Sequence, residues 1–76
     1  MKNLKFFVLS HQSLLLYRQF MKSISKIQDR QLQAEIHGQV KNEYEKYRNV
    51  EDVEVLEYLL VTGRKQLKML ESYIPQ

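Results

Sequence analysis

The chain has 76 residues, of which 43% are hydrophobic and 28% charged, with a formal net charge of +3. This length and composition predict one small folded domain and exclude a disordered chain. No cysteine is present, which excludes disulfides and thiol nucleophiles, and no apolar run approaches the roughly 20 residues that a membrane span requires.

The first predicted helix covers about residues 5–27, with Lys5 or Ser10 as its start, and its apolar side chains recur at helical spacing in one arc of roughly 160°. Arg18, Lys22 and Lys26 form a line at i, i+4 and i+8 beside that arc. Like charges in a line do not stabilise a helix. The line is therefore either a solvated face or a docking ridge for an anion.

Charge is unevenly distributed along the chain. Residues 1–28 hold five Lys or Arg and no acid, whereas residues 29–76 hold nine acids and seven Lys or Arg. A basic, acid-free, amphipathic leader is similar to a mitochondrial import signal, although a bundle with one basic helix would show the same bias. The bias also favours an acidic protein, a phosphate or a nucleic acid as partner. Nucleic acid is the least favoured, because no aromatic and Arg platform is clustered in the sequence.

The second predicted helix covers residues 29–48 and begins at Asp29, a favourable N-cap. Its apolar stripe consists of residues that recur at about four-residue intervals, namely Leu32, Ile36, Val40, Tyr44 and Tyr47. A neighbouring strip is basic and holds Arg30, His37, Lys41 and Arg48. This helix therefore also pairs an apolar face with a basic one.

The third predicted helix covers residues 50–74, with Asn49 as its N-cap and acids in its first turn, where the helix dipole favours them. Its apolar residues share an arc of about 120°, and Gly63 lies in the middle of that arc. Glycine in a helix costs about 1 kcal/mol relative to alanine. Either another helix approaches Gly63 closely, or a ligand chain occupies a groove there.

Three amphipathic helices with tight connections predict an all-α, antiparallel three-helix bundle that forms a single domain over residues 1–76. A core this small is marginal and favours stabilisation by a ligand or partner. No enzyme motif or metal-ligand set is present, and His11 and His37 are expected at the surface. An apolar interior with a positive mouth would suit an acyl chain ending in a phosphate, but an ordinary bundle core would show the same stripes.

Three segments of the sequence carry a family resemblance: L-L-L-Y-R-Q-F-M at 14–21, E-Y-E-K-Y-R-N-V-E-D at 43–52 and T-G-R-K-Q-L-K-M-L-E at 62–71. Their order and spacing resemble the LYR-motif family across nearly the whole chain, with Leu16, Tyr17 and Arg18 as the motif. The resemblance implies a non-enzymatic three-helix adaptor of the mitochondrial matrix.

The same resemblance implies a partner and a role. The partner is mitochondrial acyl carrier protein, whose acyl-4'-phosphopantetheine arm would enter an apolar groove in the core; the chain would need no cofactor of its own. The pair would support assembly or stability of a respiratory complex, with complex I as the implied client. The alternative is a permanent accessory subunit of complex I or of a mitochondrial ribosome particle.

The resemblance also implies two sets of site residues. Contacts with the carrier and its phosphopantetheine are expected from Tyr17, Arg18, Lys22, Lys41, Tyr44 and Arg48. The acyl-chain groove is expected from Met21, Ile36, Val40, Leu60, Gly63 and Leu67. Tyr44 falls where the family has Phe and adds a hydroxyl, and Glu45 departs from a position where relatives often have Arg. Gly63 falls at a small-residue position, which favours the groove.

Overall fold

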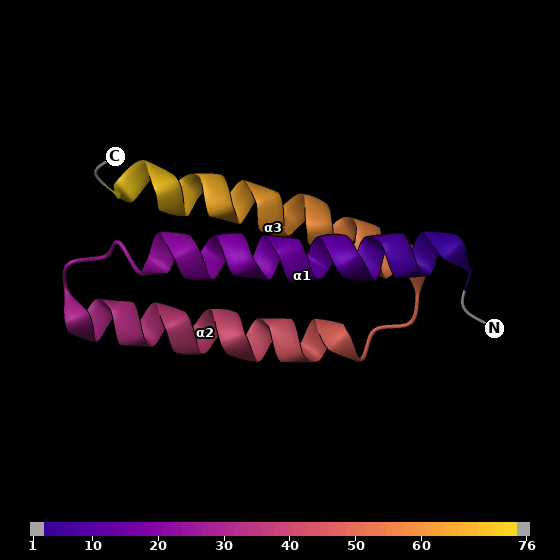
Figure 1. The fold of residues 1–76 in the computed structure, drawn as a ribbon, viewed down its shortest axis with the longest axis horizontal. Coiled ribbons are helices and arrows are strands. Elements are labelled where there is room, and N and C mark those ends of the chain that lie inside the picture. Colours follow the sequence, from indigo (N-terminus) through magenta and orange to yellow (C-terminus); the bar gives the residue numbers. More distant parts are fainter. Residues whose placement is uncertain (1–2, 75–76) are drawn as a thin grey trace.

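The computed structural model describes residues 3–74 and contains three helices, α1 (Leu4–Ile24), α2 (Arg30–Arg48) and α3 (Val53–Tyr73). No strand occurs within this described part of the chain. Residues 1–2 and 75–76 of the predicted domain lie outside it. The predicted all-α three-helix bundle is confirmed, and consecutive helices run in opposite directions (Figure 1).

The first two helices begin at side chains that satisfy free backbone N–H groups. The Oδ1 atom of Asn3 accepts a hydrogen bond from the backbone N–H of Phe6 at 2.9 Å. The Oδ1 atom of Asp29 accepts from the N–H groups of Gln31 and Leu32 at 3.0 and 3.1 Å. The prediction that Asp29 caps the second helix is thereby confirmed.

The end of α1 differs from the sequence prediction. The helix was expected to continue to Ile27, but it ends at Ile24. The reason is a tightening of the backbone, in which the N–H of Lys26 bonds the carbonyl of Ser23, and the N–H of Ile27 bonds that of Ile24, both at 3.0 Å. These short-range bonds turn the chain toward α2.

The start of α3 also differs from the prediction. Asn49, the predicted N-cap of the third helix, is instead the C-cap of α2. The N-cap of α3 is Asp52, whose Oδ1 atom accepts from the N–H of Glu54 at 2.9 Å. Asp52 and Asn49 are both good capping residues. The later one begins the helix, and residues 49–52 form a linker rather than a first turn.

Helix α1 occupies the middle of the bundle. It lies between α2 and α3 and makes almost all of the contacts between helices, whereas α2 and α3 barely touch each other (Figure 1). The described part of the chain is elongated, with extents of 44 × 20 × 15 Å. The bundle is therefore open along the side where α2 faces α3.

The buried core lies between α1 and α3. Its main cluster joins Phe6 and Leu9 of α1 to Leu56 and Leu60 of α3. Helix α2 contributes no buried residue, and its apolar stripe is at most half-buried. Because apolar burial is the main stabilising contribution to folding, α1 and α3 carry most of the stability and α2 is held more weakly.

Polar side chains also connect α1 to each of the other two helices. Lys5 of α1 forms an ion pair with Glu57 of α3, and the Arg64 guanidinium donates to Gln12 Oε1 at 3.4 Å. The side-chain amide of Gln33 donates to the carbonyl of Ile24 at 3.1 Å, which connects the start of α2 to the end of α1. The two exposed contacts between α1 and α3 contribute little energy. The partly buried bond from Gln33 to Ile24 helps to hold the start of α2 against α1.

Candidate functional site

A cavity of about 360 Å³ lies between the three helices. Its wall is formed mainly by apolar side chains, namely Leu16, Phe20, Ile36, Val40, Leu59, Leu60 and Leu70, together with Gly63. The remaining lining residues are polar or amphipathic, namely Ser13, Tyr17, Gln39, Glu43, Tyr44, Tyr47 and Gln66. The interior of the bundle is therefore incompletely filled by its own side chains.

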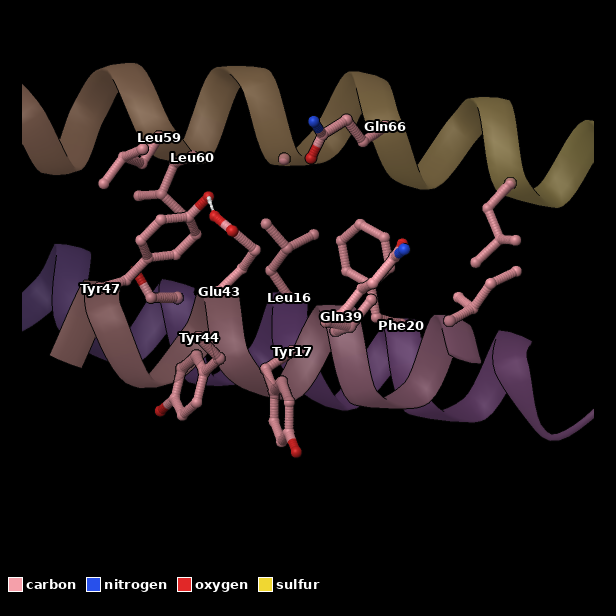
Figure 2. A pocket seen from close by; sticks show the side chains of 15 residues that line it. Leu16, Tyr17, Phe20, Gln39, Glu43, Tyr44, Tyr47, Leu59, Leu60 and Gln66 are labelled. Atoms are coloured by element: carbon pink, nitrogen blue, oxygen red, sulfur yellow. Dashed lines mark hydrogen bonds between the residues drawn. The ribbon is translucent and has the colours of Figure 1, made fainter. Parts of the chain in front are cut away.

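Polar groups of α2 gather on the side of the cavity that faces α3. In Figure 2, Glu43 and Tyr47 of α2 point toward α3, and the Tyr47 hydroxyl donates a hydrogen bond to Glu43 at 3.2 Å. Partial burial, the charge of Glu43 and this hydrogen bond all raise the pKa of Tyr47. Gln39 and Gln66 are exposed beside them. The opening between α2 and α3 is thus lined by polar groups.

The opposite wall of the cavity contains a stacked pair of tyrosines. The rings of Tyr17 and Tyr44 are nearly parallel, with centroids 4.3 Å apart and an interplanar angle of 18°. Both residues line the cavity, yet both side chains extend away from α3, along the seam between α1 and α2 (Figure 2). The pair lines the cavity on the side away from α3.

Gly63 forms part of the cavity wall and also receives a close contact. A Cβ atom added at Gly63 would lie 2.7 Å from the Cδ2 atom of Leu16 on α1. The missing side chain therefore leaves room for Leu16. This contact agrees with the interpretation that another helix approaches Gly63 closely. By contrast, a Cβ atom added at Gly38 would have nothing within 4 Å, so packing does not explain that glycine.

The structure brings together four of the six residues expected in the groove, namely Ile36, Val40, Leu60 and Gly63. Leu67 is buried but does not line the cavity. Met21 lines a separate hollow between α1 and α2, beside Tyr17 and His37. Five lining residues were not predicted for the groove, although all of them belong to the apolar faces of their helices, namely Leu16, Phe20, Leu59, Leu70 and Tyr47.

The four basic residues expected at the carrier contact are Arg18, Lys22, Lys41 and Arg48. All four are exposed, and none lines the cavity. Arg18 directly follows Tyr17, while Lys41 and Arg48 lie one helical turn before and after Tyr44. Arg18, Lys41 and Arg48 therefore lie within one helical turn of the tyrosine pair, whereas Lys22 lies farther along α1. No ion pair within residues 3–74 neutralises any of the four.

The site combines an apolar cavity with exposed cations nearby. No group of three His, Cys, Asp or Glu side chains within residues 3–74 could hold a metal ion. An apolar cavity with a few polar groups at its edge, beside unpaired cations, is typical of a ligand or partner site. The fold and the site thus define a small all-helical protein with an apolar cavity between its helices.

Comparison with known families is consistent with this class. Residues 11–69 match the family described as Complex 1 protein (LYR family), and the chain belongs to that family. It is a family of small helical adaptor-type proteins, not of enzymes, and is linked to complex I and to mitochondrial assembly. Searches of curated proteins and of solved structures gave no match. No helix in the described part of the chain is long and apolar enough to cross a membrane.

Proposed function

We propose that this chain binds mitochondrial acyl carrier protein in the mitochondrial matrix through the acyl-4'-phosphopantetheine arm of the carrier. In this proposal the pair supports assembly or stability of a respiratory complex, with complex I as the client. The observation that carries the proposal is an apolar cavity of about 360 Å³ whose tyrosine wall has three exposed cations, Arg18, Lys41 and Arg48, within one helical turn.

The size of the cavity supports an apolar chain as its ligand. A cavity of about 150 Å³ in another protein accommodates benzene, so this one has room for a considerably longer hydrocarbon. Each buried methylene contributes about 0.8 kcal/mol, so roughly eight of them would contribute about 6 kcal/mol. That contribution is comparable to the whole stability of a small domain. Chain binding would therefore also stabilise the bundle.

The cations supply a second contribution on the seam side. Arg18 and Arg48 would form charge-assisted hydrogen bonds with the phosphate of the arm or with acidic side chains of the carrier. Lys22 and Lys41 would extend the positive surface on α1 and α2. Such complementarity raises the association rate and selects acidic partners more than it raises affinity.

The tyrosine pair determines the route that the chain would take. A chain delivered from the basic surface meets the stacked rings of Tyr17 and Tyr44 before it reaches the cavity. An aromatic pair contributes only about 0.5–1.5 kcal/mol beyond its buried area, so separating the rings is inexpensive compared with the energy of the buried chain. Helix α2 has no buried residue, and its displacement would open the seam.

The client would dock on a different surface. Helix α3 carries an exposed apolar strip of Val55, Tyr58, Met69 and Tyr73, which faces away from the α1–α3 core. An exposed apolar strip of this kind favours protein contact. Carrier and client would therefore bind without competing for the same residues.

The proposal is tested by charge reversal on the basic surface. Arg18→Glu combined with Arg48→Glu should abolish copurification of acyl carrier protein from mitochondria, while helical circular dichroism is retained because both residues are exposed. The matched control is Lys65→Glu with Lys68→Glu, two exposed residues of α3, which should leave copurification unchanged. Intact mass of the copurified protein identifies the carrier and its acyl chain. Equal carrier recovery from all three proteins would refute the assignment.

A further inference from the structure

Helix α1 has a second exposed face, opposite the side that packs against the other helices. Its N-terminal half carries four apolar side chains that recur at three- and four-residue spacing and lie on one side of the helix, namely Leu4, Phe7, Val8 and Leu15. Their exposed fractions are 78%, 58%, 46% and 43%. This outer face of α1 takes no part in either cavity. It is therefore a convex apolar ridge with no partner in the described chain.

The same face becomes basic toward the end of the helix. Arg18 and Lys22 continue the spacing of Leu4 and Leu15, and Lys26 follows just beyond the helix end; all three cations are exposed. Helix α1 contains no acidic residue. Glu57 of α3 forms an ion pair with Lys5, at the other end of the helix from these cations.

Charge and shape together identify the occupant of this ridge. Full overlap with the same face of a second copy would bring like charges together, which disfavours self-association through this face. The ridge continues into three exposed cations, so its partner must combine an apolar layer with negative charge. A helix that combines leucine and phenylalanine with lysine and arginine, and lacks acids, suits the interface of an anionic bilayer.

We propose that the outer face of α1 binds the surface of a membrane that contains anionic phospholipid. Leu4, Phe7, Val8 and Leu15 enter the boundary between headgroups and acyl chains, and the cations contact the phosphates. The helix lies in the plane of the surface, and nothing spans the bilayer. Arg18 and Lys22 take part in both proposals, but the four apolar residues of the ridge are not used in the proposed carrier contact. Substituting the apolar residues alone therefore tests the membrane proposal separately.

The first test uses a fluorescent reporter on the ridge. The chain contains no tryptophan, so Phe7→Trp introduces a single reporter on the outer face, and Tyr58→Trp introduces one on the exposed strip of α3. With phosphatidylcholine vesicles that contain phosphatidylglycerol, the emission of Phe7→Trp should shift to the blue, and salt should weaken the effect. Vesicles of phosphatidylcholine alone should give no shift. Tyr58→Trp should not respond to either.

The second test measures binding itself by vesicle cosedimentation of the full chain. Leu4→Ser, Phe7→Ser and Leu15→Ser together should lower partitioning onto anionic vesicles by at least about tenfold. The control is Val55→Ser, Tyr58→Ser and Met69→Ser, which removes comparable exposed apolar surface from α3 and should change nothing.

Two outcomes would overturn the membrane proposal. One is that the unsubstituted chain stays in the supernatant with anionic vesicles, as it would if its partner were an acidic protein. The other is an equal loss of partitioning in both triple variants. Carrier copurification, measured on the same ridge variant, should be retained, which separates this result from the carrier proposal.

Discussion

Substituting the two glycines tests the cavity, because they differ in what a new side chain would meet. In Gly63→Ala the added Cβ atom would lie 2.7 Å from Leu16 Cδ2, so Leu16 must move. In Gly38→Ala nothing lies within 4 Å of the added atom. Both glycines occupy helix interiors without a positive φ. Gly38→Ala is therefore the matched control for the helix-propensity effect alone.

The expected magnitudes follow from these contacts. Alanine in place of glycine stabilises a helix by up to about 1 kcal/mol, which for a domain of this size raises the melting temperature by roughly 4–8 °C. Gly38→Ala should show this full gain. In Gly63→Ala the crowding of Leu16 opposes this gain in stability. The cost of that crowding should lie at the low end of the 1–3 kcal/mol typical of overpacking, because the adjacent cavity gives Leu16 room to rotate. The stability of the free Gly63→Ala protein should therefore be nearly unchanged.

The two glycine substitutions should affect ligand binding differently from stability. Rotation of Leu16 into the cavity would displace one or two methylenes of a bound acyl chain, which corresponds to roughly 1.5 kcal/mol and about a tenfold loss of affinity. Thermal unfolding of the free proteins, measured beside their affinity for acylated and unacylated carrier, separates the effects. Gly63→Ala should weaken only the acylated complex, and Gly38→Ala should weaken neither.

Two results would refute this reasoning. If Gly63→Ala bound acylated carrier as tightly as the unsubstituted chain, and the bulkier Gly63→Leu did also, the cavity would not be the acyl site. If Gly63→Ala instead destabilised the free protein strongly and weakened both forms of the carrier equally, Gly63 would serve helix packing alone.

Three further predictions follow from the fold and the cavity. Coexpression with acylated carrier should raise the melting temperature of the chain by mass action, and a sharply melting monomer purified alone with no gain from carrier would contradict a ligand-completed core. Because the folded state raises the pKa of Tyr47, the stability of the fold should decrease as pH rises from about 9 to 11. Thermal unfolding of Tyr47→Phe should show a smaller decrease over the same range, and an equal decrease would contradict the prediction. Asp52→Ala should lower the free energy of unfolding in urea titration by about 1 kcal/mol, and Asn49→Ala should lower it much less. A larger loss in Asn49→Ala would instead indicate that α3 begins after Asn49, as the sequence predicted.

The sequence predicted the fold well wherever local chemistry decides the outcome. Periodicity of apolar residues was sufficient for three helices, and Asp29 was identified as a cap because no nearby residue competes with it. The predicted start of α3 was wrong because Asn49 and Asp52 are both suitable N-caps, and a single sequence does not rank them. The end of α1 depends on backbone bonds around Ser23, which no side-chain pattern indicates.

The cavity was harder to predict than the helices because it depends on how far apart the helices lie. Ile36, Val40 and Gly63 were expected on its wall and line it. Leu67 belongs to the same apolar arc, yet it is buried and does not line the cavity. A helical wheel assigns a residue to a face but does not distinguish a filled interface from an open one. The separation of α2 from α3 determines that difference.

The central position of α1 has a consequence for how the chain folds. The two helices that share the buried core are separated in sequence by the whole of α2, and the contact between Gln12 and Arg64 spans 52 residues. The chain between α1 and α3 must close this long loop before the apolar core can be buried, and this requirement slows folding. A chain emerging from synthesis would present Phe6 and Leu9 to solvent until α3 is complete. The period of greatest vulnerability to aggregation therefore comes before α3 is available to cover α1.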